Sequence, residues 1–357
     1  VAQMLDKSSY SISLGNTHQD GIISSTGMDR YNVKVSADTK LTNNWSSGFT
    51  ANYITTSIDK AVTSGNGLLR TVYAAPPSYD LAGIPSHVDG NPYTQNSFRG
   101  SFDNAYWAME NNKFTEDTNR FFGNVYASYQ TDFGTTNHKL NAKYMVGVDA
   151  YTTHYVDSYG YGSNTGGGRG QIENYGWTNA TYNSLLTINY DWHINEDWGL
   201  NAVVGNEIIQ SNRKKYYEYG TNYNFPGWNH INNATTQQTE EETWKNRTVG
   251  FFGNVSASYR NMLYLTLTGR QDYVSNMPRK NRSFFYPSIS AGFILTELDA
   301  LKNNIVNHAK LRVSYAEVGQ AGDFLENYYS TPTYGGGFYT LTPIMYPMKG
   351  TTAYTPY

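Results

Sequence analysis

The residues of this sequence best suited to chemistry are scattered carboxylates, seven histidines and loops rich in aromatic side chains. Hydrolysis of a glycoside would need two carboxylates a few ångströms apart. Asp103, Glu110, Asp149 and Glu207 are candidates, but their spacing does not bring any two of them together. Each is more simply interpreted as a loop residue or as a residue facing a polar interior. The sequence therefore predicts no catalytic residues and no enzyme.

Metal and nucleotide sites are not indicated either. The histidines form no His-Glu-x-x-His arrangement and cysteine is absent, so zinc and iron–sulfur sites are not expected. The acidic run TEEET (239–243) lacks the ligand spacing of a calcium loop. The glycine-rich stretch GYGSNTGGGRG (160–170) lacks the ending of a phosphate loop and is interpreted as a flexible surface loop. The sequence predicts no cofactor.

Aromatic side chains beside amides and carboxylates are the set that suits ligand binding. A ring face can stack on a sugar, and the polar neighbours can hydrogen-bond to its hydroxyls, although the same set could bind a peptide backbone. Packing of long loops on themselves is the simpler explanation for any single residue. The candidate ligand contacts are Tyr79, Tyr93, Trp107, Trp177, Tyr223 and Trp228.

The elements that would position these loops are strands. FFGNVYASY (Phe121–Tyr129) recurs as FFGNVSASY (Phe251–Tyr259) with one change. Because alternate residues of a strand face opposite sides, Phe, Gly, Val, Ala and Tyr share one face, and Asn and Ser share the other. The same alternation in YNVKVSADT (31–39), HKLNAKYMVGVDA (138–150) and further segments predicts roughly eleven strands.

The predicted connections alternate in length. Short turns are expected at 41–45, 131–137, 193–197 and 260–262, and long polar loops at 55–119, 152–181 and 208–248. Short turns at one end and long loops at the other are typical of an outer-membrane barrel.

Aromatic residues mark both predicted ends of the strands. Trp45, Tyr129 with Phe133, Trp192 with Trp198, and Tyr259 with Tyr264 flank short turns, and Tyr31, Phe121, Tyr182, Phe251 and Phe285 are predicted near the opposite ends. The eight steps from Phe251 to Tyr259 cover about 27 Å of strand, or about 20 Å of height after tilting. That height suits an apolar band between two aromatic girdles.

Composition limits the alternatives. Aromatic residues make up 15% of the chain, which argues against disorder, and a net charge of −3 offers no basic surface for nucleic acid. Alternation alone would favour a soluble sandwich with its apolar face in a core, because soluble sheets are commoner. The girdles and the loop asymmetry favour an all-β, transmembrane antiparallel β-barrel that contacts outer-membrane lipid.

Five stretches resemble the SusC/RagA family of TonB-dependent outer-membrane transporters, and they occur in the order of that family. LTGRQDYV (267–274) is similar to an Arg-Arg-Asp strand end of the family, with Gln271 in place of the second Arg. FFYPSISAGFIL (284–295) has Phe293 where Trp is usual in the family. AKLRVSYAEVGQAG (309–322) has Ala316 in place of a Gly. The stretches are 19–45, 70–81, 267–274, 284–295 and 309–322.

The resemblance implies a twenty-two-stranded barrel around an N-terminal plug. Residues 1–357 would then be part of one barrel domain, with the plug and the C-terminal strands outside this chain. It implies active import of oligosaccharides or oligopeptides, a SusD-like surface lipoprotein over the loops, energy from the TonB complex through the plug, and a homodimer of such complexes. A passive porin or adhesin barrel, or a soluble extracellular carbohydrate-binding β protein, remains as an alternative.

Overall fold

The computed structural model describes residues 1–62, 67–97, 99–165, 167–277, 279–298, 301 and 306–319, and the backbone of two short strands beyond them. Twelve strands of this described part form one antiparallel sheet, in which each strand pairs with the next one along the chain. They are β1 (Ala2–Met4), β2 (Ser8–Asp20), β3 (Gly27–Lys40), β4 (Trp45–Lys60), β7 (Lys113–Thr131), β8 (His138–Tyr159), β9 (Gln171–His193), β10 (Trp198–Tyr223), β11 (Ala234–Tyr259), β12 (Leu263–Val274), β13 (Ser283–Ile294) and β14 (Lys310–Ala316).

The remaining elements are short. Those between β4 and β7 are α1 (Leu68–Ala74), β5 (His87–Val88), β6 (Asn91–Gln95) and α2 (Ala105–Asn111); the others are η1 (Ile231–Asn233), η2 (Leu295–Glu297), β15 (Thr333–Gly335) and β16 (Tyr346–Met348). No helix among the described residues is long and apolar enough to span a bilayer.

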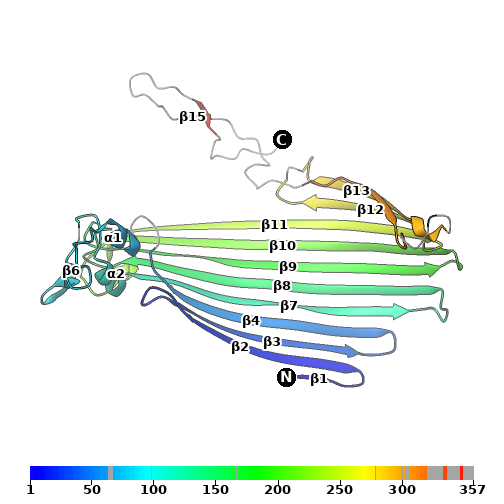
Figure 1. Ribbon diagram of the computed structural model, residues 1–357, viewed down its shortest axis with the longest axis horizontal. Helices are drawn as coiled ribbons and strands as arrows, with labels where there is room; N and C mark the ends of the chain where they lie inside the picture. The colour runs from blue at the N-terminus through cyan, green and yellow to red at the C-terminus, as the bar shows by residue number, and fades with distance from the viewer. Residues whose placement is uncertain are drawn as a thin grey trace.

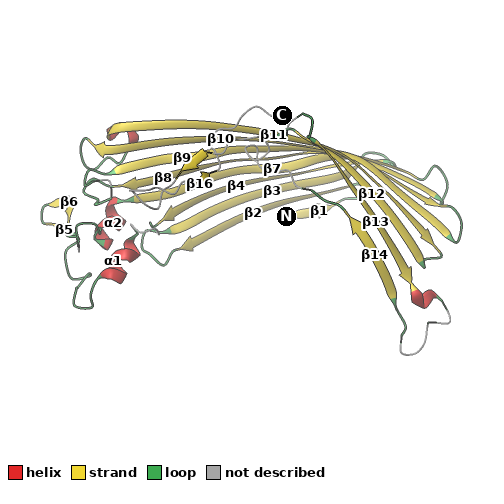
Figure 2. Cartoon of the chain, turned by 90° about the horizontal axis from the view of Figure 1, so that it is seen from above, coloured by secondary structure: helices red, strands yellow, loops and turns green. Residues whose placement is uncertain are grey.

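The long strands run side by side, and α1, α2 and β6 gather at one end of the sheet (Figure 1). Seen from above, the sheet is an arch rather than a plane (Figure 2). Curvature of this kind is what a section of barrel wall requires. The structure therefore confirms the predicted all-β architecture.

The register aligns the apolar residues of all the long strands on one face. Val125 of the first repeat copy pairs with Phe49 and Val146, and Val255 of the second copy pairs with Leu267. This apolar face exposes large side chains, because no second layer of the described chain covers it. They include Ile12, Leu14, Val33, Phe49, Val125, Val146, Leu186, Val204, Val255, Leu265, Leu267, Ile289 and Val313.

Two aromatic rows cross the apolar face. Near the short turns Trp45 lies 5.0 Å from Tyr129, and Trp198 lies 4.7 Å from Tyr259, measured between ring centroids. The row near the short turns is called the lower row, and the other is called the upper aromatic row. The prediction of the lower row is wrong at Tyr264, because pairing with Ser258 places Tyr264 on the polar face. The stretch between the two rows is called the apolar band below.

The upper aromatic row crosses the long strands β7 to β11 in their interior rather than at their ends. Tyr53 pairs with Phe121 in this row, and Phe251 and Phe285 both pair with Gln271. β10 continues past this level to Tyr223. The sequence-based placement of this row at strand ends is therefore wrong for Phe121, Tyr182 and Phe251. It is confirmed for Phe285, the third residue of β13.

The predicted long loops are too long. β8 extends to Tyr159 and β9 begins at Gln171, so most of 152–181 is strand; β10 and β11 likewise take up most of 208–248. Beyond the apolar band both faces can meet water, so apolar–polar alternation fades while the hydrogen-bonded ladder continues. The predicted difference in connection length between the two ends of the sheet also has an exception. The connection from Ile294 to Lys310 is long, although it lies at the end with the short turns.

Candidate functional site

The face opposite the apolar one carries mostly polar side chains, with single apolar residues such as Phe122 and Phe252 among them. A hollow of about 540 Å³ lies on it at the middle of β3, β4, β7, β8 and β9. Its lining is mostly amide, hydroxyl and charged, and includes Lys34, Asn52, Asn124, Asp149 and Asn183. Such a surface is suited to contact with water and polar solutes.

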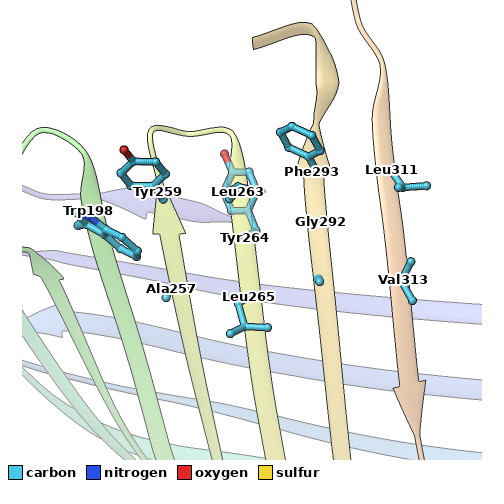
Figure 3. Close-up of a pocket in the computed structure, with 11 residues that line it drawn as sticks. Trp198, Ala257, Tyr259, Leu263, Tyr264, Leu265, Gly292, Phe293, Leu311 and Val313 are labelled. Carbon is cyan, nitrogen blue, oxygen red and sulfur yellow. The ribbon is translucent and has the colours of Figure 1, made fainter. Parts of the chain in front are cut away.

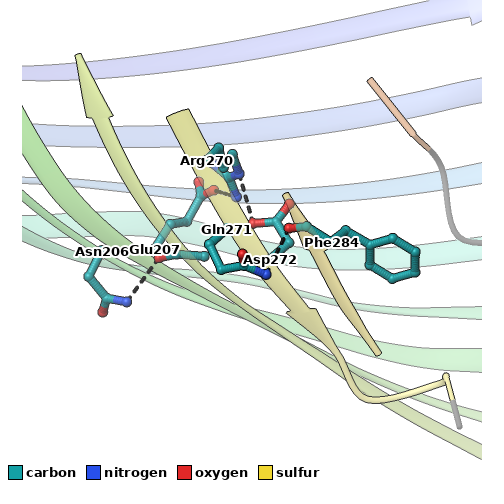
Figure 4. Close-up of polar contacts among 7 residues, drawn as sticks. Asn206, Glu207, Arg270, Gln271, Asp272 and Phe284 are labelled. Atoms are coloured by element: carbon teal, nitrogen blue, oxygen red, sulfur yellow. Dashed lines mark hydrogen bonds and ion pairs between the residues drawn. The ribbon is translucent and has the colours of Figure 1, made fainter. Parts of the chain in front are cut away.

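Charged side chains on the polar face are held in pairs and networks. Arg120 donates from Nε to Asp149 at 2.8 Å. Arg270 donates to Glu207 at 2.7 Å and to Asp272 at 2.8 Å, which links β10 to β12 (Figure 4). Asp149 and Glu207, both considered as hydrolytic groups from the sequence, are thus each engaged by an arginine. This pairing accounts for them without catalysis.

Aromatic side chains form a patch on the polar face beyond the apolar band. Tyr155, Tyr175 and Tyr217 are partners across β8, β9 and β10. The rings of Tyr155 and Tyr175 stack with centroids 4.7 Å apart, and Trp177 meets them edge-on at 5.6 and 5.9 Å. Together with Tyr219, which stacks 6.5 Å from Tyr217, these residues are called the aromatic wall.

The aromatic wall lies beyond the apolar band of its strands. Ala150 of β8 pairs with Phe121 of the upper aromatic row. Tyr155 is five residues further along, or about 16 Å at roughly 3.3 Å per residue. At the end of the same strand, the backbone N–H of Gly160 donates to Asn112, which directly follows α2. The wall therefore stands between the apolar band and the loops.

Carboxylates and cations surround the wall. Tyr175 donates its hydroxyl to Asp157 at 3.1 Å. Burial and the charge of Asp157 raise the pKa of Tyr175 far above its ordinary value. Burial likewise raises the pKa of Glu173. Lys60 lies 4.5 Å from the centre of the Tyr155 ring, and Arg213 lies 5.3 Å from that of Trp177.

Trp177 carries an unused donor. Its Nε1 is buried and has no hydrogen-bond partner among the residues that the structure describes. A buried N–H without a partner costs free energy, and a ligand oxygen that displaced the atoms covering Nε1 would recover it.

The loops beyond the wall form a packed layer around α2. The Asn104 side chain caps this helix by accepting from the backbone N–H groups of Tyr106 and Trp107. Trp107 has no exposed surface and donates Nε1 to the Pro92 carbonyl at 2.8 Å. The layer is thus held by a buried ring with a satisfied polar group.

The described parts of the glycine-rich segment, 160–165 and 167–170, pack into this layer, where the sequence predicted a flexible surface loop. Ser163 donates to Asp103 at 2.6 Å, and Gln95 donates to the Gly162 carbonyl at 2.8 Å. Gly170 adopts a positive φ of 74°, and a Cβ there would lie 2.5 Å from the Tyr223 ring. The glycine is needed because Tyr223 fills the adjoining space.

The six predicted ligand contacts fall into different surroundings. Trp177 belongs to the aromatic wall, whereas Trp107 and Tyr223 are fully buried and pack the loops. Trp228 is 44% exposed and stacks between Phe225 and His230. Tyr79 and Tyr93 are half-buried in the loop between β4 and β7.

The sequence-based candidates do not include Tyr155, Tyr175, Tyr217 and Tyr219, because their segments were expected to be loops. The sequence pattern that could have identified this site is the placing of acidic and aromatic residues at every second position, as at Glu173, Tyr175 and Trp177. Among the described residues, no group of three or more His, Asp or Glu side chains could hold a metal ion. The arrangement of rings and carboxylates is suited to binding a polar solute.

Comparison with known proteins gives matches over most of the chain. The family model described as "TonB dependent receptor-like, beta-barrel" matches residues 73–353. The chain is 26% identical over 339 residues to TonB-dependent receptor P26 of Formosa agariphila, covering 87% of this chain and 31% of that protein. It is 25% identical over 336 residues to TonB-dependent receptor SusC of Bacteroides thetaiotaomicron, covering 87% and 32%. The chain spans about a third of the length of these relatives.

Solved structures match the fold. The RagAB peptide importer in its open-open state superposes with a TM-score of 0.75 at 15% identity, covering 99% of this chain and 39% of that one. The same importer in its closed-closed state superposes with a TM-score of 0.75 at 16% identity, with the same coverage of both chains. The chain therefore belongs to the TonB-dependent receptor β-barrel family, in its SusC/RagA group, and its sheet is part of an outer-membrane barrel.

Proposed function

We propose that this chain is part of an active importer that takes oligosaccharides or oligopeptides through the outer membrane. The observation that carries the proposal is the aromatic wall on the polar face, between the loops and the apolar band. Its rings offer stacking surfaces, while Asp157, Glu173 and the Trp177 N–H offer hydrogen bonds.

A polar route from the wall toward the short turns supports passage rather than bond cleavage. The hollow near Asn52, Asn124 and Asn183 lies on the same face, further along the strands. In this proposal a SusD-like lipoprotein covers the loops, and TonB acts through a plug inside the barrel. The RagAB peptide importer and SusC, similar in fold and sequence respectively, favour this assignment.

Binding by the wall is tested with two neighbouring tyrosines. Tyr217 is part of the aromatic wall, whereas Tyr216 lies on the opposite face and hydrogen-bonds to His154. We expect Tyr217→Ala to weaken binding of the ligand found in an oligosaccharide and peptide panel by roughly tenfold. Tyr216→Ala should leave it unchanged. Equal effects of the two substitutions on ligand affinity would show that the aromatic wall does not bind the ligand.

Energy coupling is tested separately by uptake. Cells lacking TonB should stop accumulating the ligand while still binding it at the surface. Continued uptake without TonB would favour a passive porin, and ligand hydrolysis by the purified protein would favour an enzyme.

A further inference from the structure

The apolar face contains a groove near the short turns. A hollow of about 390 Å³ opens between β10 and β14, beside Trp198, Tyr259 and Phe293 (Figure 3). Its central residues lie on β11, β12 and β13, which are interior strands of the sheet.

The groove arises from the sizes of side chains in successive cross-strand rows. Tyr259, Leu263 and Phe293 form one row of large residues nearest the turns. The row of Val255, Leu267 and Ile289 is also large. Between them, Ala257, Leu265 and Ala291 form a row with two small members. A channel with an alanine on either side of Leu265 therefore runs beside the row of large residues nearest the turns.

Acyl chains are the component of the bilayer that suits this channel. The apolar band faces lipid, and a groove left empty would lose dispersion contacts along its whole lining. Lipid tails are as apolar as the protein surface, so retention of one chain depends on close packing rather than on the hydrophobic effect. A hollow lined by Trp198, Tyr259 and Phe293 provides that packing, whereas a convex surface does not.

A charged pair lies beside the groove at the turn between β11 and β12. Arg260 donates Nε to Asp197 Oδ1 at 2.9 Å and Nη2 to Oδ2 at 3.3 Å, and its guanidinium lies 5.2 Å from the Tyr259 ring centre. A guanidinium has five N–H donors, so three remain for a phosphate. The exposed Asp197 carboxylate can meet an ammonium group.

We propose that this groove binds one phospholipid whose headgroup carries both a phosphate and an amine. Its acyl chain lies over Ala257 and Ala291, its phosphate contacts Arg260, and its amine contacts Asp197. The site is on the lipid face and is independent of the aromatic wall.

The test is native mass spectrometry of the protein extracted from its membrane with mild detergent. The unmodified protein should retain one phospholipid, and Ala257→Phe with Ala291→Phe should lower the retained fraction roughly tenfold. Ala127→Phe is the matched control, because Ala127 occupies the same position in the first copy of the repeated nonapeptide and lies on the same face. It should retain the lipid.

The headgroup is tested by exchange into bilayers of defined composition. Phosphatidylethanolamine should be retained in preference to phosphatidylglycerol, and Arg260→Gln should abolish most of the retention. Equal retention by the doubly filled variant and the unmodified protein would overturn the proposal. Loss of a second polypeptide from the complex, rather than a lipid, would overturn it in favour of a protein interface. Heat-dependent gel mobility would check that the barrel assembles; if the double variant does not assemble, Ala291→Leu takes its place.

Discussion

Tyr155 and Tyr175 lie face to face on neighbouring strands, with ring planes 6° from parallel. They are direct cross-strand partners, so the hydrogen-bonded ladder between β8 and β9 sets their separation. Aromatic cross-strand pairs also stabilise a sheet. A binding surface built on strands is positioned more precisely than one built on loops. This arrangement makes the aromatic wall, rather than the loops, the centre of the proposed site.

Trp177→Phe should weaken ligand binding while leaving the sheet intact. The substitution keeps an aromatic ring against Tyr155 and Tyr175 but removes the unpartnered Nε1 donor. One hydrogen bond contributes about 1 kcal/mol, so affinity should fall roughly fivefold. Calorimetric titration measures the change. Unchanged affinity would show that Nε1 does not meet the ligand.

Trp107→Ala should loosen the loop layer, because Trp107 is fully buried and bonded to Pro92. Removing a buried tryptophan costs about 3–5 kcal/mol, here in local stability. Faster hydrogen exchange in residues 91–112 would report it. Trp228, 44% exposed, is the control, and Trp228→Ala should change exchange there much less. Similar exchange in both variants would argue against a packed layer.

Arg270→Gln should destabilise the barrel, because it leaves the carboxylates of Glu207 and Asp272 without their shared cation. Glu207 is 29% exposed, so screening limits the cost to about 1–3 kcal/mol in unfolding free energy. Adding Glu207→Gln to Arg270→Gln should restore part of the lost unfolding free energy. Urea unfolding in detergent measures both variants. No rescue by the second substitution would contradict the proposed network.

The apolar band was the part of the fold that sequence predicts best. Within it, lipid on one side and polar groups on the other impose strict alternation, so Val125 and Val255 could be assigned to a face correctly. Tyr264 was misassigned because closeness to a turn does not determine a face. Register does, and a single residue's shift reverses it.

The site was predicted less well than the fold. Its strand residues carry no apolar alternation, so Tyr155 and Tyr217 were hidden in supposed loops. Whether an aromatic side chain is buried in the loops or faces a ligand cannot be predicted from its residue type either. Trp107 and Tyr223 have the composition of ligand contacts but pack the loops, whereas Trp177 joins the wall.

Single cysteines across the second nonapeptide test most directly whether the two faces meet lipid and water. The sequence contains no cysteine, so each substitution from Phe251 to Tyr259 introduces the one thiol of this sequence. Any cysteine elsewhere in the protein would be replaced beforehand. In the assembled outer membrane, a water-soluble maleimide should label positions 252, 254, 256 and 258 faster than 253, 255 and 257. Fast labelling at 255 and 257, with protection at 254 and 256, would contradict the account.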